Sequence, residues 1–381
     1  MIYLTFNDNP SGIYISQVID VVKYLSKEHG SDIKIVSFIS IRNFSGNRKK
    51  IKKEDPSAIV IIMFPGVRHW RLNIVTLIML SLFIDFKKVI ARGPFATSLA
   101  LDLKKRDITK KVCFDARGAY KAEFNEYNVS DVISIKKEIE KIEDLNLKES
   151  DYRIAVSNAL VSYWGKNYNY NLDRHIVIPC TLNSGVSGKY PEKPFIKEAR
   201  SKLKYSDEDI VLIYSGSSAG WQSLELIDNF LIQLLQKNEK IKIVFLVEKI
   251  NDQLKIFSKY PDRVVHKWVA PNEVNNILIA CDYGLLIREK SVTNEVASPT
   301  KFAEYLAAGL NVFISDQIGD YSGYVKEHNC GLVVDPNNVE KIELKTVSYE
   351  EKKRLNTLAM KHFTKESQEN NYEKLMSVMN E

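Results

Sequence analysis

Paired cysteines are missing from this 381-residue sequence, which has four cysteines in all. The four are scattered along the chain, with neither the Cys-x-x-Cys nor the Cys/His spacing of a metal site. We therefore expect no disulfide framework and no zinc, and a reducing cytoplasm fits this cysteine usage best. These residues are Cys113, Cys180, Cys281 and Cys330.

Long apolar runs are missing too. The longest candidate is Leu72 to Phe86, LNIVTLIMLSLFIDF, whose uninterrupted apolar part runs only from Ile74 to Ile84. A membrane-spanning helix needs roughly 20 apolar residues, so we expect no span here. The opening MIYLTFNDNP has neither the basic nor the long apolar segment of a signal peptide. We expect a cytoplasmic protein.

Acidic residues are scarce in one early stretch, although the whole chain has a formal net charge of only +6. Basic residues crowd around Phe44, and Arg68 and Arg71 flank Trp70. A solvated loop is one interpretation. The other is a patch resting on the anionic lipids of the inner membrane face, with Trp70 and Phe44 as shallow anchors. No nucleic-acid motif accompanies the charge, so we expect no nucleic-acid partner. The basic residues around Phe44 are Arg42, Arg48, Lys49, Lys50, Lys52 and Lys53.

Apolar runs rich in Val and Ile alternate with amphipathic helical stretches such as ISQVIDVVKYLSKEHG (15–30). The runs do not alternate polar and apolar residues, which is typical of parallel strands buried on both faces. They lie at 2–6, 33–39, 58–64, 88–92, 111–116, 153–157 and 176–180, and then at 210–216, 242–248, 264–268, 283–287, 311–315 and 331–335.

The alternation stops at TLNSGVSGKYPEKP (181–194), whose Gly, Pro, Ser and Asn are typical of a linker. We therefore predict an α/β fold of two doubly wound, Rossmann-like domains, residues 1–185 and 186–381, facing each other across a cleft. The polar tail is predicted to be helical, and its part from about 350 to 381 is expected to pack back towards the first domain.

The stretch SPTKFAEYLAAGL (298–310) predicts a helix with a ligand at its start. Ser298 suits the N-cap and Pro299 the first helical position. The free N–H groups of Thr300 and Lys301, with the lysine charge, would attract a phosphate. Glu304, about one turn deeper, could accept hydrogen bonds from two ribose hydroxyls. From the helix alone, an ordinary capped βα helix remains an equal alternative.

With the strand NVFIS (311–315) that follows it, this stretch resembles the donor-site motif of retaining GT-B glycosyltransferases, in particular the large bacterial family 4. YSGSSAGWQSLELI (214–227) is similar to the first strand and glycine turn of that family's C-terminal domain. VIARGPFATSLALDLKK (89–105) and VCFDARGAYKAE (112–123) resemble units of capsule and O-antigen transferases. The resemblance implies that the GT-B fold spans most of the chain. It also implies a donor site made of Gly216, Ser217, Trp268, Val269, Ser298, Thr300, Lys301 and Glu304.

The sequence departs from the family pattern at one acidic and two basic positions. The family usually has another glutamate eight positions before the one that corresponds to Glu304. This chain has Val296 there, with Glu295 one place off. Ser217 and Gln222 stand where an Arg and a Lys usually clamp the diphosphate. Arg288, which follows a predicted strand, is our candidate for that charge, with Lys301 as a second clamp. A salt bridge of Arg288 with Glu289 or Glu295 is the alternative.

The acceptor is expected on the first domain, at the carboxyl ends of its strands. Gly12 follows the first strand, where a backbone must approach a ligand closely, or it is a simple turn glycine. Asp115 is expected to orient an acceptor hydroxyl, and Arg117 or Arg92 to meet an acceptor phosphate. A structural Asp–Arg pair is the alternative.

These residues lead to one predicted function. The resemblance implies a retaining, metal-independent hexosyltransferase that moves a sugar from a nucleotide-diphosphate sugar to a polyprenyl-diphosphate-linked or growing surface glycan, in bacterial polysaccharide biosynthesis. No cofactor and no metal are expected, and the one D-x-D, at Asp207–Asp209, is predicted to be a solvated turn. The alternatives are a GT-B epimerase or hydrolase of nucleotide sugars, and a non-catalytic nucleotide-sugar-binding partner subunit.

Overall fold

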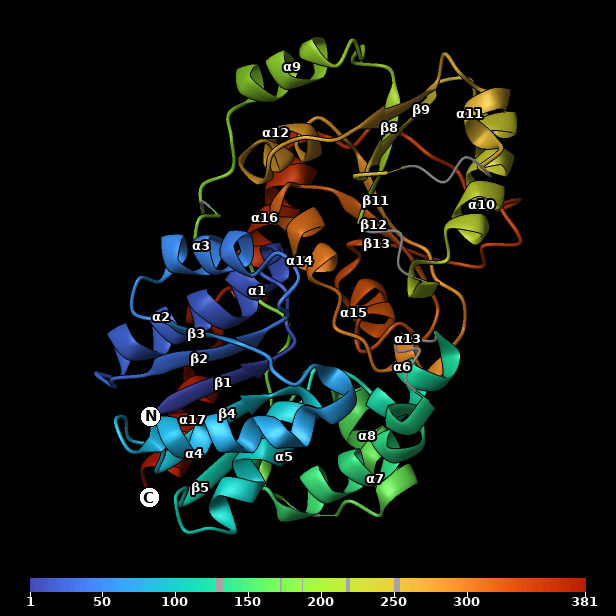
Figure 1. The fold of residues 1–381 in the computed structure, drawn as a ribbon. Coiled ribbons are helices and arrows are strands. Elements are labelled where there is room, and N and C mark those ends of the chain that lie inside the picture. Colours follow the sequence, from blue (N-terminus) through green and yellow to red (C-terminus); the bar gives the residue numbers. More distant parts are fainter. Residues whose placement is uncertain (128–132, 172, 187, 217–219, 250–253) are drawn as a thin grey trace. The chain divides into compact units, whose positions relative to one another are not determined.

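The chain divides into two structural units, each built on its own parallel sheet (Figure 1). The computed structural model describes the whole chain except residues 128–132, 172, 187, 217–219 and 250–253. Unit 1 comprises Met1–Ser184 and Lys365–Glu381, and unit 2 comprises Gly185–Thr364.

The sheet of unit 1 has seven strands in the order β3-β2-β1-β4-β5-β6-β7, and every neighbouring pair is parallel. The order turns back at β1, which pairs with β2 on one side and with β4 on the other. A doubly wound sheet of this kind brings the carboxyl ends of its strands to one edge, where ligands bind. The strands are β1 (Ile2–Phe6), β2 (Lys34–Ile39), β3 (Ile59–Ile62), β4 (Lys88–Arg92), β5 (Lys111–Asp115), β6 (Tyr152–Ala155) and β7 (His175–Val177).

Helices cover both faces of this sheet. The first of them runs without interruption from Gly12 to Glu28, and its Ile15–Ile19 part is wound as a π-helix, labelled η1. The helical elements of unit 1 are α1 (Gly12–Tyr14), η1, α2 (Asp20–Glu28), α3 (Phe44–Glu54), η2 (Val67–Asn73), α4 (Ile74–Ser81), α5 (Gly93–Lys104), α6 (Tyr120–Glu126), α7 (Ile133–Glu149), α8 (Asn158–Tyr168), η5 (Glu366–Gln368) and α17 (Glu369–Asn380).

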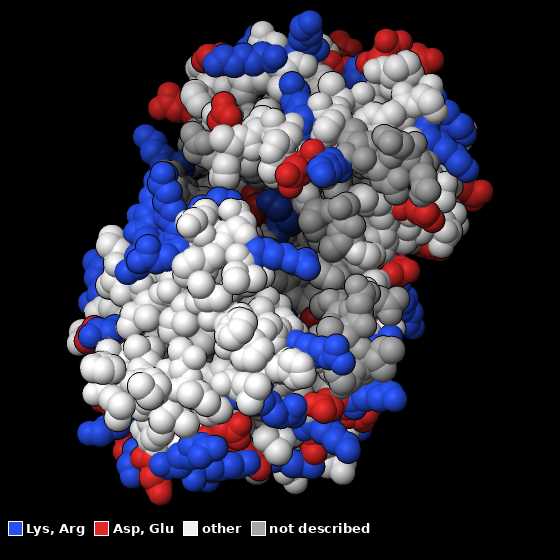
Figure 2. All heavy atoms as spheres, viewed as in Figure 1, with Lys and Arg blue, Asp and Glu red and all other residues white. Residues whose placement is uncertain are grey.

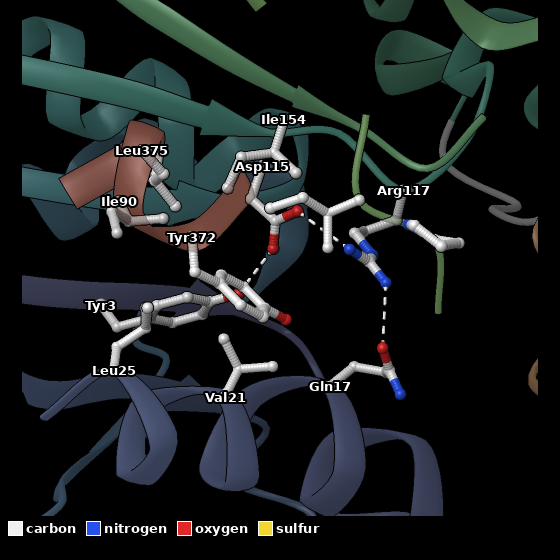
Figure 3. A pocket seen from close by; sticks show the side chains of 12 residues that line it. Tyr3, Gln17, Val21, Leu25, Ile90, Asp115, Arg117, Ile154, Tyr372 and Leu375 are labelled. Carbon is white, nitrogen blue, oxygen red and sulfur yellow. Dashed lines mark hydrogen bonds and ion pairs between the residues drawn. The ribbon is translucent and has the colours of Figure 1, made fainter. Parts of the chain in front are cut away.

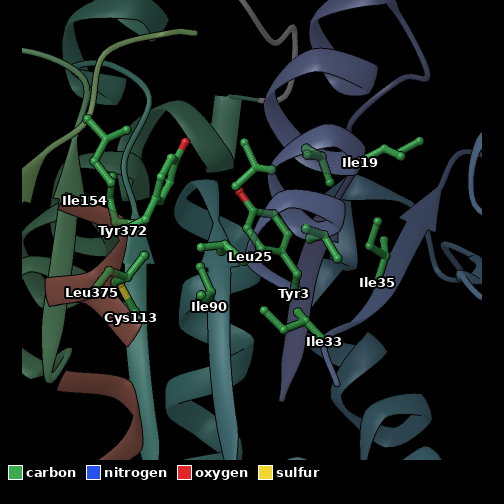
Figure 4. Close-up of a cluster of buried hydrophobic side chains, with 14 of the residues drawn as sticks. Tyr3, Ile19, Leu25, Ile33, Ile35, Ile90, Cys113, Ile154, Tyr372 and Leu375 are labelled. Carbon is green, nitrogen blue, oxygen red and sulfur yellow. The ribbon is translucent and has the colours of Figure 1, made fainter. Parts of the chain in front are cut away.

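The hydrophobic core on one face of this sheet joins the two ends of the chain (Figure 4). Tyr3 and Ile90 point from the strands towards Leu25 of α2 and towards Tyr372 and Leu375 of α17. Burial of a large apolar side chain contributes about 1.5–3 kcal/mol each. The C-terminal helix is therefore part of the core of unit 1.

Unit 2 has a six-stranded parallel sheet in the order β10-β9-β8-β11-β12-β13. Its central strands β8 and β11 are buried along their whole length, as their continuous apolar runs predict. The strands are β8 (Ile210–Ser215), β9 (Ile241–Leu246), β10 (Val264–Lys267), β11 (Tyr283–Leu286), β12 (Asn311–Ser315) and β13 (Gly331–Val334).

The helices of unit 2 connect these strands and cover both faces. They are α9 (Lys193–Lys202), η3 (Gly220–Gln222), α10 (Leu224–Lys237), α11 (Ile256–Lys259), η4 (Pro271–Glu273), α12 (Val274–Leu278), α13 (Val292–Glu295), α14 (Thr300–Ala307), α15 (Tyr321–His328) and α16 (Tyr349–Phe363).

The secondary structure agrees with the sequence pattern. Each predicted apolar run overlaps a strand, and residues 181–192 are free of helix and strand where the structure describes them. The predicted helical tail is confirmed as α16 and α17, separated by the short turn η5. Among the described residues, no helix is both long enough and apolar enough to cross a bilayer.

One residue of the expected basic patch lies in the interior. One of the two interpretations of the basic stretch made Trp70 a membrane anchor, but only 2% of its surface is exposed, and its ring packs at 5.2 Å from that of Phe95 on α5. Phe44 is half-buried against the core of unit 1. The anchor role is therefore wrong for Trp70, because its indole faces inward and packs against α5.

Candidate functional site

The carboxyl ends of the central strands of unit 2 form the candidate donor site. Arg288 lies two residues beyond β11, and its backbone N–H donates to Ser315 Oγ at 2.9 Å, at the end of β12. At the end of β8, the N–H of Ser215 donates to the hydroxyl of Tyr305, on α14, at 2.9 Å. Residues from β8, β11, β12 and α14 are thus brought to one edge of the sheet, although they lie far apart in the sequence.

The guanidinium of Arg288 is held in place by two neutral side chains. Nη1 donates to Asn294 Oδ1 at 3.2 Å and Nη2 to Gln222 Oε1 at 3.5 Å. Amide oxygens orient a guanidinium without cancelling its charge, and Arg288 is only 8% exposed. Gln222, which the sequence resemblance places at the position of a cation, therefore contacts the residue that we expected to supply that charge.

The helix of the donor motif begins one residue later than predicted. The N-cap of α14 is Pro299, in an extended conformation, and Thr300 is the first helical residue. The prediction of Ser298 as N-cap is wrong, because the hydroxyl of Ser298 is instead hydrogen-bonded to that of Tyr321, at 2.7 Å. The backbone N–H groups of Thr300 and Lys301 still lie in the first turn, where intrahelical acceptors are missing.

Lys301 and Glu304 form an ion pair on the surface of α14. The ammonium of Lys301 donates to a carboxylate oxygen of Glu304, three positions on, and the two side chains are 27% and 33% exposed. An ion pair with this much water contact is worth about 1 kcal/mol or less. An incoming phosphate and sugar hydroxyls could therefore replace it at little cost.

Close packing fixes α14 on the sheet. A Cβ at Gly284 of β11 would lie 2.3 Å from the ring of Tyr305, so only glycine leaves room for that ring. Gly309 ends the helix at a φ of +77°, and a Cβ there would lie 2.5 Å from the hydroxyl of Tyr190. The glycine in the Ala-Ala-Gly end of the motif is thus required by backbone conformation and by packing.

Three of the remaining predicted donor residues, Gly216, Trp268 and Val269, follow the carboxyl ends of strands of the same sheet. Gly216 directly follows β8, whereas Ser217 lies outside the described residues. Trp268 follows the edge strand β10 and is 61% exposed, and Val269 is half-buried. Three strand spacings separate β10 from β11, about 14 Å. The resemblance implies that Trp268 and Val269 line the pocket for the nucleotide base, at a distance from the phosphate groups, and this stays a prediction.

In unit 1, three predicted site residues form one cluster around the buried Asp115, and Figure 3 shows two of them, Asp115 and Arg117; the third is Arg92. Asp115 accepts from Arg117 Nη1 at 3.1 Å through Oδ1, and from Arg92 Nη1 at 3.4 Å through Oδ2. The hydroxyl of Tyr3 also donates to Oδ2, at 2.5 Å. Burial alone would raise the pKa of Asp115, but the Arg117 and Arg92 guanidiniums and the Tyr3 hydroxyl lower it overall.

Both arginines of this cluster also donate hydrogen bonds to side chains other than Asp115. Arg92 Nε donates to Asp8 Oδ2 at 3.0 Å, and Arg117 Nη2 donates to Gln17 Oε1 at 3.4 Å. Gln17, on the π-helical turn η1, also donates from Nε2 to the carbonyl of Thr181 at 2.6 Å. The sequence analysis missed Tyr3 and Gln17, because nothing near them in the sequence points to Asp115.

The cavity beside this cluster is too small for a sugar. Its volume is about 20 Å³, which holds a single water molecule, and Tyr3, Gln17, Asp115 and Arg117 line it. Asp115 is 2% exposed. These observations favour the structural Asp–Arg alternative over direct contact with an acceptor hydroxyl.

Gly12 is the first residue of α1, after the N-cap Ser11, whose hydroxyl accepts from the N–H of Tyr14 at 3.3 Å. A Cβ on Gly12 would meet no atom within 4 Å. The protein itself does not require a glycine there, so the close approach that we expected would have to come from a ligand.

The prediction for the D-x-D sequence can be checked in the structure, whereas the expected absence of a metal stays a prediction. The D-x-D at Asp207–Asp209 lies in a turn before β8, at the opposite edge of the sheet from Arg288, so the prediction of a turn is confirmed. Within the described part of the chain, no group of three or more His, Cys, Asp or Glu residues could hold a metal ion. The four cysteines are buried, and among the described residues they form no disulfide.

Comparisons with known proteins show the fold. No protein-family model matches the sequence, and no curated protein matches it either. Among solved structures, HepE of Anabaena in complex with UDP and glucose is similar at a TM-score of 0.72 and 11% identity, over 99% of this chain and 100% of that one. A glycosyltransferase from Rickettsia africae reaches 0.66 at 17% identity, over 99% and 97%.

A third solved structure agrees with these two. A mutant of TarM from S. aureus, in complex with UDP, fondaparinux and a GlcNAc-glycerol, is similar at a TM-score of 0.67 and 11% identity, over 100% of both chains. At such identities the likeness establishes the fold. The chain has the GT-B fold of two Rossmann-like domains, as the sequence predicted.

Proposed function

We propose that this chain is a retaining glycosyltransferase that moves a hexosyl group from a nucleotide-diphosphate sugar to a lipid-linked or growing surface glycan. The proposal includes a metal-independent reaction, a polyprenyl-diphosphate-linked acceptor and a place at the cytoplasmic face of a bacterial membrane. The observation that carries it is the grouping of Arg288, Lys301 and Glu304 at the carboxyl edge of the second sheet. The GT-B neighbours solved with UDP support the same class of donor.

Each group of this site has a role in the proposed reaction. Negative charge grows on the departing diphosphate as the glycosidic bond breaks, and fixed positive groups that face this charge lower the barrier. Arg288, held by Asn294 and Gln222, supplies one such charge. Lys301 and the first turn of α14 supply another. Glu304, released from Lys301, accepts hydrogen bonds from the ribose hydroxyls.

The experiment is incubation of the purified chain with UDP-, GDP- and dTDP-sugars, in the presence and absence of EDTA. We expect slow release of nucleotide, free sugar that first appears with the anomeric configuration of the donor in NMR spectra, and no effect of EDTA. Inversion would contradict the retaining mechanism. A donor epimerised without release would favour the epimerase alternative, and binding without turnover would favour the non-catalytic subunit.

Substitution of Glu304 tests the site itself. Glu304→Ala should weaken donor binding or turnover at least about tenfold, the loss of hydrogen bonds to a charged acceptor. Calorimetry with the preferred donor and the release assay measure this loss, and an unchanged melting temperature shows that the fold is intact. Glu327→Ala, an exposed glutamate on α15 in the same unit, is the matched control and should change neither. Equal behaviour of the two variants would remove Glu304 from the site.

A further inference from the structure

Large apolar side chains lie exposed on one surface of unit 1. They come from the end of β3, from η2 and α4, and from the turn after α4. We call this surface the apolar face. It consists of Phe64 (74% exposed), Leu72 (57%), Val75 (59%), Met79 (57%), Leu82 (72%) and Phe83 (80%).

Helix α4 lacks the polar outer side that a surface helix normally has. Its sequence, IVTLIMLS, is apolar all round, yet Leu77 is its only buried residue. Single exposed apolar residues are ordinary on proteins, but a contiguous group of this size marks a site of interaction.

The apolar face is held rigidly by the residues beneath it. Asn73 is fully buried; its side chain accepts from the N–H of Phe64 at 3.0 Å and donates to the carbonyls of Pro65 and Trp70 at 2.9 and 3.0 Å. Trp70 packs on Phe95 below. The interior position of Trp70, which contradicted the expected anchor, thus helps to keep Phe64 and Leu72 pointing outward.

Positive charge lies next to the apolar face. Helix α3 leads into β3, the edge strand of the sheet, and η2 and α4 follow β3. Figure 2 shows the blue side chains of α3 at the border of a broad white surface. Four cations of α3 are exposed, and no ion pair is found for them among the described residues. They are Arg48, Lys49, Lys50 and Lys53.

We propose that the apolar face and the cations of α3 together dock unit 1 on a bilayer that contains anionic lipids. Side chains such as Leu82 and Phe83 enter the boundary between head groups and acyl chains, and α3 lies over the phosphates. This anchoring rests on the membrane location that the proposed function includes and names the surface responsible for it. It uses residues of unit 1 alone and does not depend on the donor chemistry proposed for unit 2.

The charge distribution favours lipid over a second copy of the chain. A symmetric dimer through the apolar face would bring two α3 helices, each with several cations, towards one interface, and like charges there oppose association. Between Arg42 and Asn73 the sequence has eight basic residues and two acidic ones, Glu54 and Asp55. An anionic membrane meets both parts of this surface at once.

The test is sedimentation of the full chain with vesicles of phosphatidylcholine alone and with about 30% phosphatidylglycerol, without donor or acceptor. We expect binding to the anionic vesicles, weaker binding to the neutral ones, and a loss of the difference in high salt, which screens the charges. Absence of binding to vesicles of either composition would overturn the proposal.

Two double variants separate the parts of the surface. Leu82→Ser with Phe83→Ser should reduce binding to both kinds of vesicle at least about tenfold. Lys49→Glu with Lys53→Glu should reduce binding to the anionic vesicles by a similar factor. The matched controls in unit 2 are Phe195→Ser and Lys259→Glu with Lys341→Glu, all exposed, and they should bind as the parent does.

Light scattering after size-exclusion chromatography tests the alternative that a second copy of the chain covers the apolar face. We expect the parent and the Leu82/Phe83 variant to have the same mass in solution and the same rate of donor hydrolysis. An oligomer of the parent that the variant breaks into monomers would assign the apolar face to a second copy and overturn the lipid proposal. A chain that binds vesicles but hydrolyses no donor would leave this proposal standing while the proposed function fails.

Discussion

At the scale of single residues, Asp115 shows how burial and charge decide what a side chain can do. Its carboxylate lies between the guanidiniums of Arg92 and Arg117 and accepts from the hydroxyl of Tyr3. Removal of one partner from a buried group of this kind leaves charge without compensation. We therefore expect Asp115 to act mainly through the stability of unit 1 and the position of Arg117.

Asp115→Asn should lower the free energy of unfolding at pH 7 by about 3–5 kcal/mol, because it removes the carboxylate between two largely buried guanidiniums, of which Arg92 keeps its partner Asp8. The pKa of Asp115 is lowered in the folded chain, so its contribution is complete above the ordinary Asp pKa of about 3.9. This stabilisation is lost as the pH falls through the pKa of Asp115 in the folded chain, so the difference in unfolding free energy between parent and variant should narrow there. Denaturant titrations measure this difference, with the exposed Asp32→Asn as control. Equal stability of parent and Asp115→Asn at pH 7 would contradict the structural role.

At the scale of elements, α6 is joined to α7 through the fully buried Glu143, and the half-buried Glu123 of α6 lies near it. Glu143 of α7 accepts from the first backbone N–H groups of α6, those of Tyr120 and Lys121, at 3.2 and 2.9 Å, and so caps that helix. Burial raises the pKa of Glu143 to about 7, despite these hydrogen bonds. Burial, and then the nearby Glu143 carboxylate, raise the pKa of Glu123 on α6 to about 8.

These raised pKa values predict that unit 1 becomes less stable as the pH rises. The folded chain holds protons on Glu123 and Glu143 that the unfolded chain has already released above its pKa of about 4.3, so stability falls between there and about pH 8. Glu123→Gln keeps the shape and removes one of the two charges. It should raise the free energy of unfolding at pH 8.5 by on the order of 1–2 kcal/mol and leave it nearly unchanged at pH 5.

Thermal and denaturant unfolding at both pH values test this expectation. Glu140→Gln, an exposed glutamate one turn before Glu143, pairs with Lys121 at the surface and serves as the control. A parent whose stability rises from pH 5 to pH 8, or a Glu123→Gln variant with the same pH profile as the parent, would contradict it.

At the scale of the whole molecule, the chain leaves unit 1 at Ser184 and returns to it at Lys365. The ammonium of Lys365 donates to the carbonyl of Leu182 at 2.8 Å, where the two crossing segments lie side by side. Burial lowers the pKa of this lysine. Helix α17 then fills the core over β7 and α2, although it is the last helix of the sequence.

Truncation after Thr364 should therefore unfold unit 1 selectively. Four core side chains are lost with α17, each worth about 1.5–3 kcal/mol, and their sum approaches the 5–15 kcal/mol that stabilises a typical domain. Hydrogen exchange measured by mass spectrometry should become fast in β1 and β5–β7 and stay slow in β8, β11 and β12. Removal of Glu381 alone is the control, and slow exchange retained in β1 after truncation would contradict the role of α17. The four side chains are Tyr372, Leu375, Met376 and Met379.

Part of the donor site could be predicted from the sequence because it lies within one local motif. The spacing in SPTKFAEYLAAGL places Lys301 and Glu304 on one side of a short helix and a glycine at its end, and both features are present. The contact of Gln222 with Arg288 could not be predicted, because it joins segments 66 positions apart. The same holds for Tyr3 and Asp115, which are 112 positions apart.

The sequence by itself determined the strands, the parallel sheets and the break between the two halves, because these follow from local apolar patterns and turn residues. Only the tertiary structure decided which apolar segments are covered. Trp70 is interior although basic residues flank it in the sequence, and α4 is exposed although its sequence is apolar. The physical reason is that burial depends on what packs against a segment, and here the covering elements come from distant parts of the chain.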